Sequence, residues 1–296
     1  MVILLLSGIA EPLSMHFHST CTWPPGIVLL LLSTGALYVI GAQNLRRTTA
    51  RSQPIQSLCF ALGWLSLLVA LDSPIHELGE QLFWIHMAQH EILMLVAAPL
   101  IALGDPLVVS LYAFRPEWRR RISGISRVPI LRALWSAITN PLSAWILSAA
   151  ALWIWHLPWL FDKTVDNDWM HAAQHTSFFL TALLFWWPLA SRRPAMGYGA
   201  GILYLFTTAL HTSILGALLT FATRAWYRPY FATASAWHLT PLEDQQLGGL
   251  IMWIPGGSVL LVVALVLLVR WLNVSQVRWQ YTRVADLARS PQGGAQ

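Results

Sequence analysis

Two copies of one five-residue pattern carry most of the side chains in this sequence that suit a metal ion. The pattern is H-x-A-Q-H, which occurs as His86-Met-Ala-Gln-His90 and as His171-Ala-Ala-Gln-His175. On a helix, residues i and i+4 lie on one face about 6 Å apart, so both imidazoles of a pair can point at the same ion. Two such helices side by side would offer four ring nitrogens. The repeat also predicts a partial internal duplication of a two-helix unit.

Further candidate ligands surround these pairs. Met94 continues the face of the first pair one turn deeper on an ideal helix, and Met252 lies in the outer half of a later apolar segment. His76, His156 and His211 are candidate additional ligands or relay positions. Neutral imidazole suits copper, zinc and iron, while thioethers favour Cu(I). A His/Met set therefore predicts copper as the metal.

Cysteine adds nothing to this set, because Cys21 and Cys59 lie far apart and form no CxxC pair. Glu91 follows His90 directly and is turned by about 100° from the face of the pair, so we expect a supporting residue or a proton site rather than a ligand. P-loop, GxGxxG, GxSxG and HExxH motifs are absent from the sequence, which leaves nucleotide, hydride and common hydrolase chemistry without support. The chain is predicted not to be an enzyme.

The composition shows what must position these side chains. Of the 296 residues, 56% are hydrophobic and only 10% are charged, whereas about 25% of the residues of a soluble domain are charged. This excess of apolar residues excludes the soluble, disordered and disulfide-rich secreted classes. The predicted fold is an all-α, multi-pass bundle of transmembrane helices.

Seven stretches are long and apolar enough to span a bilayer core of about 30 Å as helices. They lie near 26–43, 55–71, 82–103, 141–157, 170–190, 199–221 and 248–270. The sequence thus predicts an external N-terminal segment (1–25), a seven-helix transmembrane domain (26–272) and a cytoplasmic tail (273–296). Pro141, Pro158 and Pro188 should mark helix ends, while Pro99 and Pro255-Gly-Gly should bend the third and seventh spans.

The basic residues orient this bundle. Fifteen of the eighteen Lys and Arg residues lie in the connections 43–54, 104–140 and 191–198 and in the C-terminal tail. Lys163, Arg224 and Arg228 make up the rest. The positive-inside rule therefore predicts an external N-terminus and a cytoplasmic C-terminus. With this topology none of the ten histidines lies in a cytoplasmic loop, and His211 lies about 15 Å below its external helix end. His90 lies at a similar depth, so His90 and His211 could share a site.

The arginine-rich segments invite a nucleic-acid interpretation, but their place beside membrane spans favours anionic lipid headgroups. The acidic run Glu243-Asp244-Gln245-Gln246 before the last span is expected to be a solvated loop, with reception of an incoming cation as the alternative.

Several segments together resemble the CtaG-type family of cytochrome c oxidase assembly factors. The resemblance rests on the run from His86 to Pro99, Trp155-His156-Leu-Pro158, the second H-x-A-Q-H with Phe185-Trp-Trp-Pro188, and the run from Asp244 to Gly257. It covers roughly residues 55–270. Glu91 departs from the family pattern, which has an apolar residue there.

This resemblance implies a multi-pass protein of the bacterial plasma (inner) membrane that helps to mature haem–copper oxidases through their copper centres and has no turnover of its own. The implied partners are cytochrome c oxidase subunits or other copper-delivery proteins, besides the lipid bilayer and a second copy of the chain as a homodimer. Nucleic acid is not among them.

Three other functions fit the same residues. Two histidines from opposite helices would suit the axial ligands of a membrane haem. Three or more would suit a zinc hydrolase, with Glu91 or Asp72 as its general base. Finally, the pairs could be interhelical hydrogen-bond clamps without any ligand, although ionisable residues inside spans usually mark functional sites.

Overall fold

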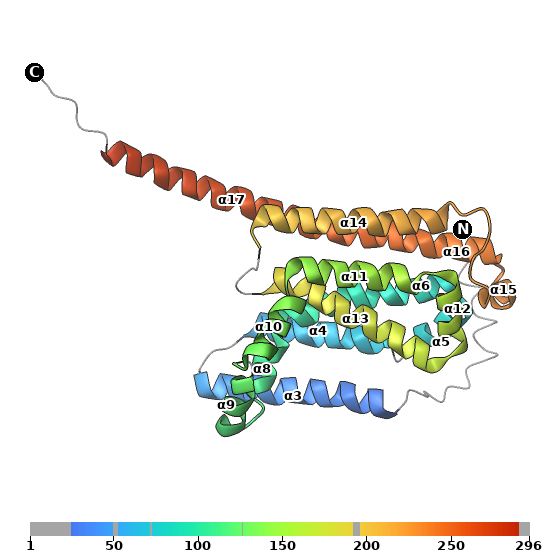
Figure 1. The fold of residues 1–296 in the computed structure, drawn as a ribbon, viewed down its shortest axis with the longest axis horizontal. Helices are drawn as coiled ribbons and strands as arrows, with labels where there is room; N and C mark the ends of the chain where they lie inside the picture. Colours follow the sequence, from blue (N-terminus) through green and yellow to red (C-terminus); the bar gives the residue numbers. More distant parts are fainter. Residues whose placement is uncertain (1–24, 50–52, 72, 126, 192–195, 290–296) are drawn as a thin grey trace, which may run out of the picture.

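The computed structural model describes residues 25–49, 53–71, 73–125, 127–191 and 196–289. All regular elements in these ranges are helical, and no strand occurs among them. The helices run side by side as a bundle, with the end of α17 (Gly257–Arg289) reaching beyond the others (Figure 1). The all-α, multi-pass fold predicted from the sequence is confirmed.

The long helices form the body of the bundle. They are α3 (Pro25–Thr49), α4 (Pro54–Leu71), α11 (Pro141–Trp155), α13 (Asp168–Ala190), α14 (Tyr198–Thr220) and the pair α16 (Pro241–Ile251) and α17, which are joined by a π-helical turn, η3 (Met252–Gly256). Another span consists of α6 (Phe83–Glu91), the π-helical turn η1 (Ile92–Ala97) and α7 (Ala98–Leu103). Its segments pack against α4, α13 and α16. In the most apolar 18-residue stretch of this span 56% of the residues are buried, whereas in the corresponding stretch of α3 only 17% are buried. The span α6–η1–α7 is therefore the centre of the bundle.

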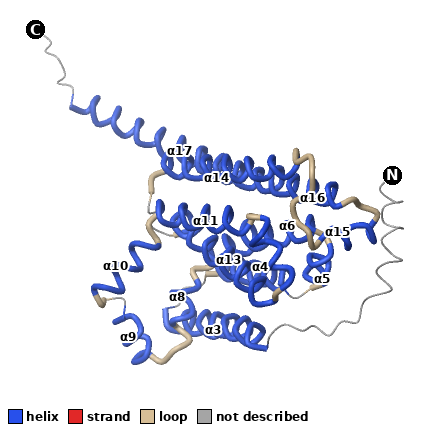
Figure 2. The backbone as a smooth tube through the Cα atoms, turned by 45° about the vertical axis from the view of Figure 1, so that its right-hand side comes forward, coloured by secondary structure: helices blue, strands red, loops and turns tan. Residues whose placement is uncertain are grey.

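Short helices lie at the two ends of the bundle (Figures 1 and 2). One end has α5 (Pro74–Gln81), α12 (Pro158–Asp166), α15 (Tyr230–Thr233) and the 3-10 turn η2 (Ala234–Trp237). The other has α8 (Pro106–Leu111), α9 (Pro116–Ile125) and α10 (Pro129–Ile138). The arginine-rich α9 and the last turn of α3 with Arg46 and Arg47 lie at the same end as the C-terminal part of α17. The basic segments that are described thus share one end, as the sequence predicts; which side of the membrane that end faces stays a prediction.

Prolines explain where many helices begin. Pro141 and Pro158 are the first residues of α11 and α12, where the missing N–H would have had no partner in any case. Pro188 instead lies in the last turn of α13. Pro99 follows η1 and Pro255 lies within η3, so each of the two spans expected to bend contains a π-helical turn beside its proline.

Five helices among the described residues are long and apolar enough to cross a membrane: Val28–Thr49, Pro54–Leu71, Phe83–Leu103, Tyr198–Thr220 and Pro241–Tyr281. A sixth arises if α10 and α11, which meet at 60°, are one span. The remaining predicted span coincides with α13, whose first turns carry the polar residues of the second H-x-A-Q-H pattern. Seven spans therefore remain a prediction, as does the external segment 1–25, of which residues 1–24 lie outside the described chain.

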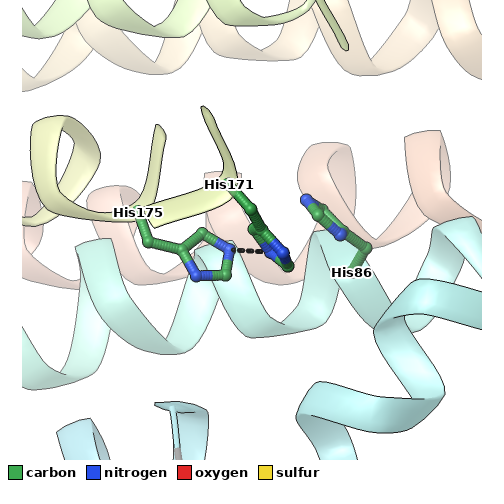
Figure 3. Close-up of side chains that lie close together, drawn as sticks. All are labelled: His86, His171 and His175. Atoms are coloured by element: carbon green, nitrogen blue, oxygen red, sulfur yellow. Dashed lines mark hydrogen bonds between the residues drawn. The ribbon is translucent and has the colours of Figure 1, made fainter. Parts of the chain in front are cut away.

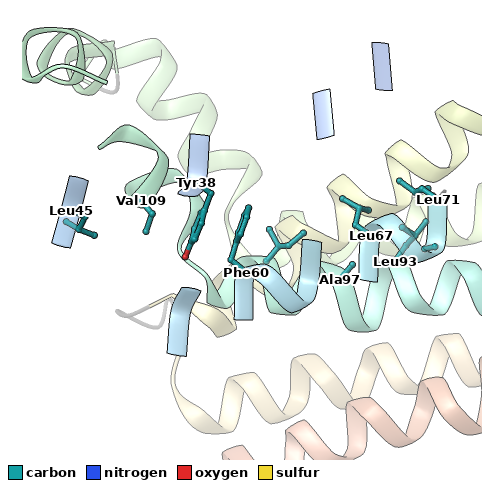
Figure 4. Packing of buried hydrophobic residues seen from close by; sticks show 10 residues of the cluster. Tyr38, Leu45, Phe60, Leu67, Leu71, Leu93, Ala97 and Val109 are labelled. Atoms are coloured by element: carbon teal, nitrogen blue, oxygen red, sulfur yellow. The ribbon is translucent and has the colours of Figure 1, made fainter. Parts of the chain in front are cut away.

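Apolar side chains hold the central span in place. Tyr38, Leu45, Phe60, Leu67, Leu71, Leu93, Ala97 and Val109 pack between α3, α4, η1 and α8 (Figure 4). Within this cluster the Tyr38 and Phe60 rings stack, and the Tyr38 hydroxyl donates to the carbonyl of Gly104 at 2.9 Å. Many of the outward-facing Leu, Ile and Val side chains of the long helices are exposed, as expected of a surface that meets lipid.

Candidate metal centre

Six histidines gather at the end of the bundle that holds α5 and α12. His86 and His90 come from α6, His171 and His175 from α13, His76 from α5, and His156 from the end of α11. The ring centroids of His86 lie 4.4 Å from His90, 5.1 Å from His171 and 5.6 Å from His175. The centroids of His90 and His156 are 6.4 Å apart. We call these six residues the histidine cluster.

Three members of the cluster form its tightest group. One ligand nitrogen from each of His86, His171 and His175 lies within 4.8 Å of the others. The Nε2 atoms of His171 and His175 are 3.2 Å apart, and the His86 ring faces them from α6 (Figure 3). All three side chains are buried. The two pairs thus lie on neighbouring helices, but the tight group contains one histidine of the first pair and both of the second, and His90 is not part of it.

Two histidines of the cluster form a hydrogen bond through one ring nitrogen that leaves the other ring nitrogen free as a lone pair. The Oε1 atom of Gln174 can only accept, so Nε2–H of His86 donates to it at 3.3 Å and leaves Nδ1 as a lone pair. Likewise, Nδ1–H of His156 donates to the carbonyl of Leu152 at 2.7 Å and leaves Nε2 as a lone pair. A hydrogen bond on the far ring nitrogen is the usual support of a metal-ligating histidine.

Four buried ring nitrogens of the histidine cluster have no hydrogen-bond partner among the described residues. They are Nδ1 of His86, both ring nitrogens of His90 and Nε2 of His156. Leaving buried polar atoms unpaired costs about 1–3 kcal/mol each. A metal ion would satisfy several of them at once, so the donor set fits a cation that accepts imidazole.

The glutamine of each pattern forms a hydrogen bond with a histidine of another helix. Gln174 of α13 binds His86 of α6, whereas Gln89 of α6 donates to Nδ1 of His76 at 3.3 Å and to the carbonyl of Ala70 at 2.7 Å. The pattern alone does not show which glutamine bonds to which histidine.

The cluster opens toward the surface through α5. His76, Glu80 and His171 form a second group of potential ligands within 4.8 Å of one another. The side chain of His76 is 25% exposed and that of Glu80 52%, so together they link the buried group to the surface. Partial burial raises the pKa of the Glu80 carboxyl, and the negative charges of Asp168 and Glu77 raise it further. Sequence reasoning missed Glu80, although the i, i+4 spacing of His76 and Glu80 is the signal that identifies it.

Aromatic side chains close the rest of this end. Phe83, Phe161, Tyr227 and Tyr230 are buried and pack against one another, and the Phe161 ring lies 5.1 Å from His86. The hydroxyls of Tyr227 and Tyr230 donate to the carbonyls of His156 and Gly79. The segment after α14 thereby covers the cluster.

The acidic run 243–246 lies in the first turns of α16 and is not the solvated loop that the sequence predicts. Asp244 is fully buried, and its carboxylate accepts from the backbone N–H groups of Phe83 and Trp84 at 2.8 and 3.0 Å. It thus caps the N-terminus of α6, where a negative charge is favourable. Glu243 instead forms a capping box with Thr240. The sequence could not show this, because Asp244 lies 161 residues from Phe83.

Two predicted ligands lie elsewhere. The His211 and Trp145 rings lie nearly perpendicular with their centroids 5.4 Å apart, and His211 lines a cavity together with Met94 and Glu91. Met94 leaves the His86–His90 face because η1 begins directly after Glu91, and a π-helical turn breaks the 3.6-residue period on which that prediction depended. His238 lies outside the cluster, on the exposed turn after η2. His16, His18, Cys21 and Asp72 lie outside the described residues.

The chemistry of this arrangement is the binding of a cation by neutral nitrogen ligands. Cys59 belongs to neither ligand group, so the buried group offers imidazole alone and the outer group imidazole and carboxylate. Imidazole suits copper and zinc, while the Glu80 carboxylate at the surface adds a negative charge that attracts either ion.

Comparison with known proteins gives a family match. The family described as "Cytochrome c oxidase caa3 assembly factor" matches residues 36–273, most of the chain. That range includes all six histidines of the cluster and the cavity that holds His211.

Curated relatives are more distant and longer. An uncharacterized protein of Mycobacterium leprae is 26% identical over 83% of this chain, and one of Mycobacterium bovis is 27% identical over 79%. The chain spans only 38% and 36% of the lengths of these relatives. No solved structure matches the chain significantly.

Proposed function

The chain belongs to the family of cytochrome c oxidase caa3 assembly factors, and from this premise we propose that it binds copper at the histidine cluster and delivers it during oxidase assembly. The copper is cargo, taken up at one end of the bundle and passed on, rather than a cofactor of a reaction. The proposed location is the bacterial plasma membrane. The proposed partners are oxidase subunits or other copper-delivery proteins, together with a second copy of the chain in a homodimer.

The observation that carries this proposal is the tight group of His86, His171 and His175, whose ligand nitrogens lie within 4.8 Å of one another. Helix–helix packing alone would not require three buried imidazoles at one point, since burying polar side chains in a membrane costs free energy. The unpaired nitrogens of His90 and His156 add ligands on the inner side. A copper ion can thus exchange one imidazole for the next without entering lipid.

Uptake is proposed to begin at α5. Glu80 and His76 are the exposed members of the ligand series, and His171 belongs both to their group and to the buried one. An ion bound between Glu80 and His76 therefore has a shared ligand through which it can move inward.

The first test is metal content. Wild-type chain purified in detergent should retain copper, and His175→Asn should lose it. His238→Asn is the matched control, because His238 is an exposed histidine outside the cluster whose backbone φ of 57° asparagine tolerates. An absorption spectrum of the same samples separates the alternatives, since a Soret band would replace the copper proposal with haem.

The second test measures oxidase assembly in cells. A strain that lacks the chain should contain oxidase with a reduced copper-to-haem ratio. Wild-type chain and His238→Asn should restore the ratio, whereas His175→Asn should not. Full restoration by His175→Asn would overturn the proposal that the histidine cluster delivers copper.

A further inference from the structure

The cavity lined by His211, Met94 and Glu91 lies within the bundle, beside the histidine cluster. It has a volume of about 50 Å³ and is lined by residues of the central span, α11, α13, α14 and the α16–η3–α17 span. Its polar lining includes Glu91 and His211, and its sulfur-bearing lining includes Met94 and Met252. A site for one water needs roughly 10–15 Å³ measured in the same way, so the space suffices for an ion or a few waters.

Two polar atoms at this cavity lack partners. Oε2 of Glu91 and Nδ1 of His211 are buried and have no hydrogen-bond partner among the described residues. The Glu91 carboxylate lies against Gly256, where a Cβ would come within 2.7 Å of Oε2, so a larger residue there would displace the carboxylate. An unpaired carboxylate in a membrane interior is strongly disfavoured and calls for a cation or a proton.

The two π-helical turns bring the methionines to this cavity. Met94 lies in η1 and Met252 begins η3, and both line the cavity beside Glu91 and Gly256. Such turns interrupt α-helices mostly at functional sites, because they redirect side chains at a cost in hydrogen-bond geometry. Here two of them, from helices far apart in sequence, flank the same space.

We propose that this cavity is a second metal site, which binds a monovalent soft cation, Cu(I), through Met94, Met252 and His211, with the Glu91 carboxylate balancing its charge. Thioether and imidazole together select Cu(I) over harder ions. One carboxylate and one monovalent ion give a neutral pair, the least costly charge state in a low-dielectric interior. The histidine cluster, by contrast, has no buried carboxylate in its tight group.

This inference deepens the proposed function, on which it rests for the identity of the metal. Because His90 belongs to the histidine cluster and Glu91 lines the cavity, neighbouring residues of α6 connect the two sites. An ion that leaves the cluster would pass from nitrogen ligands to the sulfur-bearing site deeper in the bundle.

The test counts silver ions bound to the detergent-purified full chain, since Ag(I) is a redox-stable substitute for Cu(I). Wild-type chain should bind two ions, and the double variant Met94→Leu/Met252→Leu only one. Met87→Leu is the matched control, because Met87 is a fully buried methionine of α6 that does not line the cavity. It should still bind two.

The outcomes separate this inference from the proposed function. If His175→Asn removes the single ion that wild type binds while the methionine double variant retains it, the cavity proposal is overturned and the cluster stands. If only the double variant removes an ion, the cavity site stands and the cluster does not bind metal. A double variant with unchanged metal content indicates a cavity that holds water alone and overturns the inference.

Glu91→Gln tests the charge balance. Removing one partner of a buried charge pair should weaken Ag(I) binding at the cavity by roughly 30-fold or more. Met87→Leu should leave this affinity unchanged. An affinity unchanged in Glu91→Gln, measured in protein with wild-type thermal stability, would show that the carboxylate does not face the ion.

Discussion

The two H-x-A-Q-H helices share a pattern but are positioned by different means. The N-terminus of α6 is capped by the buried carboxylate of Asp244, which comes from a distant helix. The N-terminus of α13 is capped by its own neighbour, Asn167, whose exposed side chain accepts from the N–H of Met170. The first pair thus depends on the packing of α16, whereas the second is fixed locally.

The helices also differ after the pattern. In both, the two rings of the pair come together to a similar distance, 4.4 Å for His86 and His90 and 4.3 Å for His171 and His175. Beyond His90, however, the chain enters η1, while α13 continues as a regular helix to Ala190. A local pattern therefore fixes the geometry of each pair, but the surroundings decide what the rest of the helix contributes.

The largest expected effect tests whether the two pairs hold a single ion. We expect His86→Asn and His175→Asn each to abolish copper binding at the cluster, and the double variant to be no worse, because ligands of one ion act as a unit. Copper per chain and thermal stability are measured together. Losses of stability that add, with wild-type copper content, would instead identify two independent structural clamps.

The next effect compares the two caps. Asp244→Ala removes two charge-assisted hydrogen bonds, one from a buried and one from a partly buried N–H group, and should lower the free energy of unfolding by about 1.5–3 kcal/mol. Asn167→Ala removes an exposed cap and should cost about 1 kcal/mol or less. Reversible unfolding in mixed micelles measures both. Equal losses would contradict the view that the first helix depends more on tertiary packing.

The smallest effect distinguishes the two glutamines. Gln174→Leu removes the acceptor that fixes the tautomer of His86 and should weaken copper binding about tenfold, the low end for such supporting residues. Gln89→Leu mainly removes the hydrogen bond to Ala70 and should cost about 1 kcal/mol of stability while the affinity stays nearly unchanged. Titration with a competing chelator gives the affinities. If Gln89→Leu weakened binding more, His76 would be the more important ligand.

Much of this molecule follows from local features of the sequence. The apolar stretches determine a helical membrane protein, since a chain in lipid must satisfy its backbone hydrogen bonds internally. The i, i+4 spacing places His86 and His90 on one face of their helix, and His171 and His175 on one face of theirs. The clustering of basic residues in particular segments predicts that they share one end of the bundle. The helical character of each span and the geometry of each pair depend only on residues within a few turns of one another.

The tertiary structure decided which helices became neighbours. Long helices that are apolar on every side carry no periodicity to identify a partner, so the meeting of α6 with α13 and the capping of α6 by Asp244 could not be read from the sequence. The same holds for the assignment of His211 and Met94 to a separate cavity, because π-helical turns shift the register of the helices that contain them. Contacts between segments far apart in the chain, rather than local spacing, therefore determine which of the predicted ligands can share an ion.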